Sequence, residues 1–229
     1  NLTPLAVGTL VDYSANNQDL SAEIIYLATK GYIHINRIET TKLLVFKGHD
    51  YELKKLKEAG PELNEVDKML LEGLFESGNE LKLSDLSKNI SFGKELQKIK
   101  TKTTEALVKD KYFPRSPWTL TIICVIIGII LAIWGSIFMG AIFGFFGGLA
   151  TALSGLIIAG FGFLMPNRTV KGVETRALIL GLKEYMNVAE KDRLKFHNAP
   201  EKNPQLFEKL LPFAIALGVD KAWSKQFED

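Results

Sequence analysis

Hydrophobic residues are distributed unevenly along the chain, and one long run of them divides it. The run extends from Thr119 to Met165 and contains no Asp, Glu, Lys, Arg, His, Asn or Gln. A helix that crosses a membrane needs about 20 apolar residues, because each residue advances about 1.5 Å through a hydrocarbon core about 30 Å thick. The run therefore predicts a transmembrane helical hairpin over 116–167. Its expected parts are a first span, a turn rich in small residues and a second span, at Thr119–Ile137, near Gly135, Ser136 and Gly140, and at Ala141–Met165.

Two alternatives to this hairpin stay open, namely a re-entrant second segment and a buried helical pair in a large soluble protein. Small residues recur at every fourth position of the run, which places each set on one face of a helix. Such faces let two backbones approach closely in lipid. They either close the hairpin against itself or, through Gly144 and Gly148, form a dimer interface. The helix-packing residues expected from this spacing are Gly128, Ala132, Ser136, Gly140, Gly144, Gly148 and Ala152.

Charge on either side of the run predicts its orientation. Positive flanks stay on the cytoplasmic side, so we expect a multi-pass protein of the bacterial plasma (inner) membrane whose N- and C-terminal parts are cytoplasmic. The absence of ionisable residues inside the spans argues against a transporter or pump acting alone. The single cysteine, Cys124, lies in the first span and forms no intramolecular disulfide, as expected for reduced cytoplasmic domains. The basic flanking residues are Lys109, Lys111, Arg115, Arg168, Lys171 and Arg176.

The residues before the run follow the element order of two small winged-helix-like units, at 1–60 and 61–115. In the first unit, Thr3-Pro4 starts a helix, Asp19 caps a second helix and Gly31 ends it. The remaining elements follow from helical or alternating apolar spacing. They are a helix at Leu20–Lys30, strands at Tyr32–Ile35 and Leu43–Phe46, a helix at Asn64–Phe75, a strand at Glu80–Leu83 and helices at Asp85–Lys88 and Phe92–Lys109.

A row of lysines, Lys94, Lys98 and Lys102, follows one face of the last of these helices. Three interpretations stay open. The row is an ordinary solvated face, a contact with anionic lipid headgroups, or a contact with nucleic-acid phosphates. The net charge of the whole chain is only +2, so composition carries no general signature of nucleic-acid binding.

The last part of the chain, 168–229, is expected to be a cytoplasmic helical domain. A helix is predicted at Thr169–Glu190 and another at Gln205–Leu217, bent or interrupted at Pro212 and ended by Gly218. Its many apolar residues pack on a neighbouring helix, on the N-terminal units or on the membrane surface. The expected fold class is a mainly α membrane protein: a two-helix transmembrane hairpin at 116–167, winged-helix-like α/β units and this C-terminal helical domain.

Several stretches of the chain resemble one known family. They include Lys30-Gly31-Tyr32-Ile33-His34-Ile35 near the start, Leu180-Gly181-Leu182-Lys183-Glu184-Tyr185, and Leu211-Pro212-Phe213-Ala214-Ile215-Ala216-Leu217-Gly218 near the end. Together they resemble the YciQ-like predicted membrane proteins, a bacterial and archaeal family of unknown function. The resemblance implies that this chain follows a signal sequence, an extracytoplasmic β-rich domain and a further span. It implies no activity and no catalytic residues.

Candidate chemistry is sparse. His34, His49 and His197 are isolated in the sequence, and no serine elbow or paired nucleophile and base is present. We therefore expect no catalytic, cofactor-binding or metal-binding residues and no enzyme. The leading hypothesis is a membrane-anchored interaction or scaffold module that couples an extracytoplasmic part to a cytoplasmic protein partner, or forms a homo-oligomer. The alternatives are a membrane-tethered nucleic-acid-binding regulator and an accessory subunit of a transport or enzyme complex.

Overall fold

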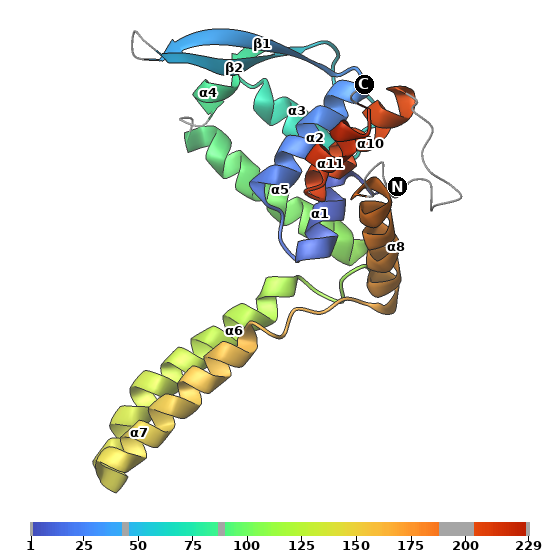
Figure 1. The fold of residues 1–229 in the computed structure, drawn as a ribbon. Helices are drawn as coiled ribbons and strands as arrows, with labels where there is room; N and C mark the ends of the chain where they lie inside the picture. The colour runs from blue at the N-terminus through green and yellow to red at the C-terminus, as the bar shows by residue number, and fades with distance from the viewer. Residues whose placement is uncertain (1, 43–45, 87–89, 188–203, 228–229) are drawn as a thin grey trace. The chain divides into compact units, whose positions relative to one another are not determined.

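The structure is a computed structural model that describes residues 2–42, 46–86, 90–187 and 204–227. Residues 1–106 and 175–229 form one compact unit, and residues 107–174 form a second. The first unit begins with helices α1 (Pro4–Asp12) and α2 (Asn17–Thr29), followed by strands β1 (Ile33–Lys42) and β2 (Phe46–Lys55) (Figure 1). It continues with α3 (Glu65–Leu74), β3 (Glu80–Lys82), α4 (Leu83–Leu86) and α5 (Ile90–Lys109).

Helices α2 and α3 both begin at an asparagine that caps the first turn. The Asn16 side chain accepts a hydrogen bond from the Asp19 amide at 3.0 Å, and the Asp19 side chain accepts one from the Asn16 amide at 2.9 Å. This reciprocal pair satisfies backbone N–H groups that the helix itself leaves unpaired. The expected cap at Asp19 is therefore wrong by three residues, because Asp19 is the third helical residue and Asn16 is the cap. For α3, the predicted cap Asn64 is confirmed by a 2.8 Å bond from the Asp67 amide.

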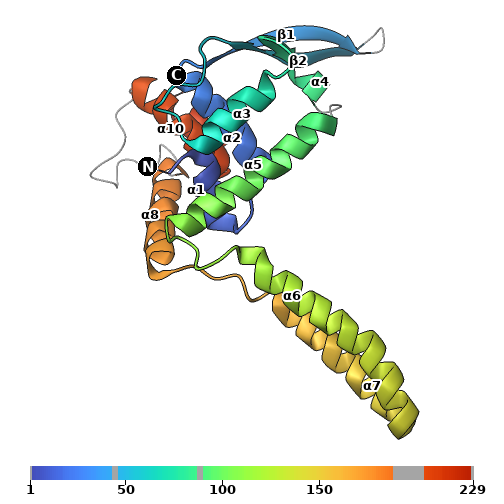
Figure 2. The same cartoon turned by 180° about the vertical axis from the view of Figure 1, so that it is seen from behind.

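The three strands form one antiparallel sheet in the order β1-β2-β3. Ile33 pairs with Lys55 at the base of the two long strands, and Leu53 pairs with Leu81 on β3. The strands β1 and β2 extend as a ribbon past α4 (Figure 2). They are longer than the sequence predicted because most of their residues are polar, which hides the alternation that marks a half-buried strand. The predicted strand Leu43–Phe46 overlaps β2 only at Phe46, and its first three residues lie outside the described residues.

One hydrophobic core joins elements from both predicted winged-helix-like units. It contains Leu5 and Leu27 from the first and Leu70, Leu71 and Ile99 from the second. Strand β3, predicted in the second unit, completes the sheet of the first. The boundary between 1–60 and 61–115 stays a prediction, but the two stretches share a core and a sheet.

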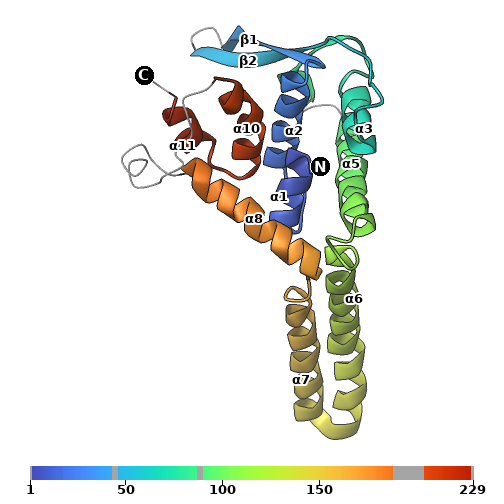
Figure 3. The same ribbon diagram turned by 90° about the vertical axis from the view of Figure 1, so that its right-hand side faces the viewer.

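The end of the chain packs on the first two helices. Helix α10 (Pro204–Ala216) lies beside α1 and α2, and α11 (Asp220–Lys225) packs on α10 (Figure 3). The ring of Phe213 meets that of Tyr26 edge-on at 6.3 Å, and the Gln18 side chain donates to the Ile215 carbonyl. Trp223 is fully buried and stacks on Phe207, with ring centroids 6.4 Å apart. The apolar residues of α10 are thus covered within the unit, and the helix continues through Pro212.

The second unit contains the apolar run as α6 (Pro117–Ile130), the π-helical turn η1 (Leu131–Gly135) and α7 (Ser136–Gly162). Among the described residues, Pro117–Gly162 is the one helical stretch long and apolar enough to cross a membrane. Gly144 interrupts it with φ of 69°, a left-handed value that glycine adopts without a steric penalty. The turn expected near Gly135 and Gly140 is therefore wrong, because both residues are helical here. Helix α8 (Val170–Asn187) follows and leads back into the first unit.

Candidate functional site

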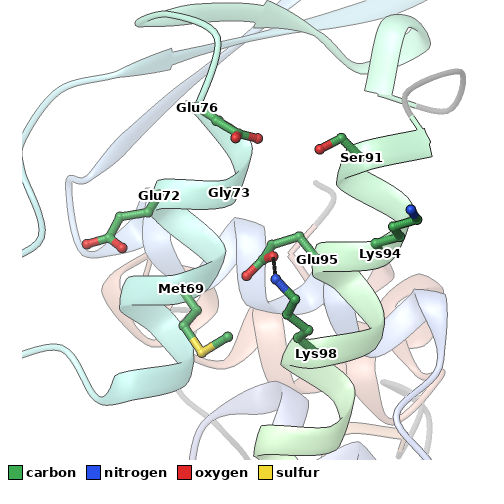
Figure 4. Close-up of a pocket in the computed structure, with 8 residues that line it drawn as sticks. All are labelled: Met69, Glu72, Gly73, Glu76, Ser91, Lys94, Glu95 and Lys98. Atoms are coloured by element: carbon green, nitrogen blue, oxygen red, sulfur yellow. Dashed lines mark hydrogen bonds and ion pairs between the residues drawn. The ribbon is translucent and has the colours of Figure 1, made fainter.

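A groove lies between α3 and α5 and contains two of the three lysines that the sequence singled out. The α3–α5 groove encloses about 400 Å³. Met69 and Glu72 line it from α3, Glu76 lines it from the turn after α3, and Lys94 and Lys98 line it from α5. The remaining lining residues are Gly73, Ser91 and Glu95. Figure 4 shows Glu76, Ser91 and Glu95 in the space between the two helices, with Lys98 turned toward Glu95. Glu72 and Lys94 point outward from the two helices.

The lysine row is largely neutralised by acidic neighbours. Lys98 forms an ion pair with Glu95 at 2.8 Å, and Lys102 forms one with Glu105 at 3.1 Å. The hydrogen bond that Lys98 donates to Glu95 raises the pKa of Lys98, so this ammonium stays charged. Lys94 and Lys98 share the groove with three glutamates, whereas Lys102 does not line it. A surface of alternating charge suits a protein partner better than a polyanion, because phosphate binding needs uncompensated basic groups.

Close backbone packing inside the apolar run involves several of the predicted small residues. A Cβ atom added to Gly155 would lie 2.5 Å from the Gly128 carbonyl oxygen and 2.6 Å from the Ala132 amide. A Cβ added to Gly148 would lie 3.0 Å from the Ser136 carbonyl oxygen. Contacts this close exclude larger side chains, which is how small residues allow helices to associate in lipid. Gly155 and Gly162 were not predicted as packing residues, although Gly148, Gly155 and Gly162 follow one another at intervals of seven residues.

The two ends of the apolar run are hydrogen-bonded to each other. The Thr169 hydroxyl donates to the Lys111 carbonyl at 2.6 Å, and the Thr169 amide donates to the Tyr112 carbonyl at 3.1 Å. The Lys171 ammonium donates to the Asp110 carbonyl at 2.7 Å and lies 4.1 Å from the centre of the Tyr112 ring. Residues just before the run and just after it are therefore neighbours.

Three carboxylates are buried at the N-termini of α1, α2 and α3. The Glu23 Oε2 atom accepts from the Leu5 amide at 2.7 Å, at the start of α1, where Thr3 makes no side-chain cap to the helix. Asp19 accepts from the Asn16 amide at the start of α2, and Asp67 accepts from the backbone and side chain of Asn64 at the start of α3. A carboxylate at this end of a helix meets unpaired N–H groups and the positive end of the helix dipole.

Burial sets the ionisation of these three groups. Glu23 and Asp19 are 0% exposed, and Asp67 is 3% exposed. Loss of solvent raises the pKa of Asp19 from 3.8 to about 6 and raises the pKa of Asp67 from its ordinary value, although helix amides oppose both shifts. Burial, the charge of Asp67 and contact with its carboxyl group raise the pKa of Glu23 well above its usual range. The sequence does not single out Glu23 or Asp67, because each occupies an unremarkable helix position, and it marks Asp19 only as a helix cap.

Metal and catalytic chemistry have little support in the described part of the chain. His34 is exposed on β1, His49 belongs to β2 and His197 lies outside the described residues. No group of three or more His, Cys, Asp or Glu side chains that could hold a metal ion is found among the described residues. The assignment of no catalytic, metal or cofactor residue stays a prediction.

A second hollow, of about 600 Å³, lies between α2 and α10 and includes Tyr26, Lys30, Lys209 and Phe213. Lys30 lies 5.1 Å from the centre of the Tyr26 ring, a cation–π contact that occupies part of this wall. The hollow contains Glu208 as well, so it is of mixed charge like the α3–α5 groove.

Comparison with known proteins gives one match. The family described as "Predicted membrane protein (DUF2207) C-terminal domain" matches residues 1–227. No curated protein matches the chain. No solved structure matches it either.

Proposed function

Because the chain belongs to the predicted membrane protein (DUF2207) C-terminal domain family, we propose that it is a membrane-anchored interaction module without catalytic activity of its own. Residues 116–167 form a transmembrane hairpin in this proposal. The first unit lies in the cytoplasm and binds a protein partner. An extracytoplasmic part, which the resemblance to YciQ-like proteins implies, supplies the signal that the module passes on.

The observation that carries the hairpin is the hydrogen bonding of Thr169 to the carbonyls of Lys111 and Tyr112. It keeps the two ends of the apolar run together, which supports a placement of both ends on one side of a membrane. Residues 1–106 and 175–229 also share one compact unit, which supports the same placement. A segment whose two ends lie on the same side of a membrane crosses that membrane an even number of times. As one straight helix, its 46 residues would be about 69 Å long, more than twice the hydrocarbon core.

The surface of the second unit supports insertion into lipid. Its large apolar side chains are exposed, reaching 76% for Phe145 and 80% for Phe146. A water-soluble protein rarely leaves so large a continuous apolar surface uncovered. Its helical backbone pairs nearly all of its own polar groups, as the hydrocarbon region demands. The basic residues that flank the run support the cytoplasmic placement of both ends.

The interaction role is supported by the α3–α5 groove. The charged residues on its α3 side are all glutamates, whereas α5 contributes both lysines and Glu95. Charge patterns of this kind select partners more than they add affinity. A rigid, mixed-charge groove suits a partner segment with complementary charges. The hollow between α2 and α10 has the same character, although its wall is partly filled by the contact between Lys30 and Tyr26.

Cysteine labelling tests the proposed topology. In a Cys124→Ala background, single cysteines replace Asn17, Lys221 or Phe146, all of which are exposed. A membrane-impermeant maleimide added to intact cells is expected to label Phe146→Cys alone, and to label the other two only after permeabilisation. Labelling of only one of Asn17→Cys and Lys221→Cys in intact cells would show an odd number of crossings and refute the hairpin. Labelling of both would invert its orientation.

A further inference from the structure

The contact between Glu23 and Asp67 is the most unusual buried feature outside the groove. Glu23 belongs to α2 and Asp67 to α3, and their carboxyl groups lie within hydrogen-bonding reach of each other. The Glu23 Oε1 atom and the Asp67 Oδ1 atom are both buried and have no hydrogen-bond donor among the described residues. Two buried carboxylate oxygens repel each other unless a proton lies between them, and a buried charge without a hydrogen-bond partner destabilises the folded state. One proton therefore satisfies both orphaned atoms at once.

We propose that Glu23 and Asp67 share one proton and so form a proton-dependent clamp that joins α1, α2 and α3 and opens in alkaline solution. Glu23 is central to the clamp because its other oxygen accepts from the Leu5 amide at the start of α1. Asp67 joins the pair to the start of α3 through Asn64. With the proton present, one hydrogen bond connects the two acids, and each acid still holds its helix terminus. Without it, two negative charges face each other in a site that excludes water.

The surroundings offer little to replace the proton. The positive charge of Lys30, at the end of α2, lowers the pKa of Asp67. The Lys30 ammonium itself lies over the Tyr26 ring. On α1, the Thr3 hydroxyl donates to Glu23. Asp19 lies one turn away on α2. The charge of Asp12 on α1 raises its pKa, and the charge of Lys100 on α5 lowers it. From α10, Glu208 and Lys209 lie in the hollow that contains Lys30 and balance each other in charge. None of these groups supplies a donor to the orphaned oxygens.

The pH dependence follows from proton linkage. The clamped state holds a proton that the opened state releases, since in water a glutamic acid ionises at about pH 4.3. Above that pH, and until the clamped pair itself ionises, the equilibrium between clamped and opened states shifts toward opening by about tenfold for each pH unit. Because α3 forms one wall of the α3–α5 groove, opening changes that groove. The clamp does not depend on the proposed function.

Infrared spectroscopy of the full chain in detergent micelles tests whether the proton is present. At pH 7.5 the Asp19 carboxyl is ionised, since burial raises its pKa only to about 6. The wild-type protein is expected to show a C=O stretching band of a buried protonated acid. That band should be absent from Glu23→Gln and from Asp67→Asn, because an amide N–H donates to the remaining carboxylate in place of the proton. A spectrum of the wild type without the band would overturn the proposal.

Hydrogen exchange tests whether the proton closes the clamp. The amides of α3 are compared between the wild type and Glu23→Gln at pH 6.5 and again at pH 8.5, so that intrinsic exchange rates cancel at each pH. We expect the ratio of wild-type to variant rates to rise about 10- to 100-fold between the two pH values. The control is Glu72→Gln, at an exposed position on the same helix. The ratio of wild-type to Glu72→Gln exchange rates should be the same at pH 6.5 and at pH 8.5. Asp67→Asn serves if Glu23→Gln does not fold. A ratio that stays constant with pH for the variant that folds would refute the clamp.

Discussion

The native cysteine offers a direct test of how the apolar run folds. Cys124 lies in α6, and a Cβ atom at position 162 in α7 would lie 2.9 Å from the Cys124 Cβ atom. Disulfides need a Cβ separation of about 3.8 Å, so a shift of about 1 Å lets Gly162→Cys form one. In a single straight helix the two positions would be 162 − 124 = 38 residues apart, which is about 57 Å. A disulfide within one chain is therefore possible only if the run folds back on itself.

The assay oxidises Gly162→Cys protein in membranes and then counts free thiols after denaturation, by alkylation and mass spectrometry of the monomer. We expect both thiols to be blocked in a monomer of unchanged size. Gly160→Cys is the matched control, because a Cβ atom at Gly160 meets nothing within 4 Å, and its Cys124 should remain free. Equal thiol blocking in the two variants would refute the packing of α6 against α7. Disulfide-linked dimers of Gly162→Cys without a blocked monomer would instead favour association between chains.

Two further predictions concern the first unit. Burial raises the pKa of Asp19 from 3.8 to about 6, so between these pH values the folded state keeps a proton that the unfolded state has lost. The free energy of unfolding of the wild type therefore falls by about 1 to 3 kcal/mol as the pH rises from about 4 to about 6. Asp19→Asn should reduce this fall. Urea unfolding of both proteins at pH 4 and pH 6.5 measures this, and an equal fall in both would contradict it. Replacing Lys98 and Lys102 together by alanine should leave binding of the full chain in nanodiscs to duplex DNA unchanged, because Glu95 and Glu105 already pair these lysines. Fluorescence anisotropy at low and physiological salt checks this, and a salt-dependent loss of affinity would favour the nucleic-acid alternative.

Local signals predicted much of the secondary structure. The apolar run, the cap at Asn64 and the helix ends at Gly31 and Gly218 are all present, and both glycines have the positive φ that such an end requires. Each of these features depends on residues within one or two helical turns. Their physical cause is therefore visible in a short stretch of sequence.

Features that depend on distant residues were missed. Glu23 and Asp67 are separated by 67 − 23 = 44 residues and look like solvated helix positions until α2 and α3 meet. The interruption at Gly144 was missed because eight other glycines lie in the run. Contacts between distant residues, such as those of Gly128 with Gly155, are not visible in a short stretch of sequence. The full length of the ribbon was missed because its polar residues carry no alternating pattern.

The two units are stabilised in different ways, so their perturbations are separable. The first unit buries a hydrophobic core and can therefore tolerate three buried carboxylates, provided that helix termini and protons satisfy them. The second unit gains nothing from burying apolar groups in lipid and depends on close contacts at glycines such as Gly128 and Gly155. A change at Glu23 should alter the pH dependence of the first unit without affecting the disulfide at Gly162→Cys. A change at Gly155 should do the reverse, because a larger side chain there affects packing and no ionisable group.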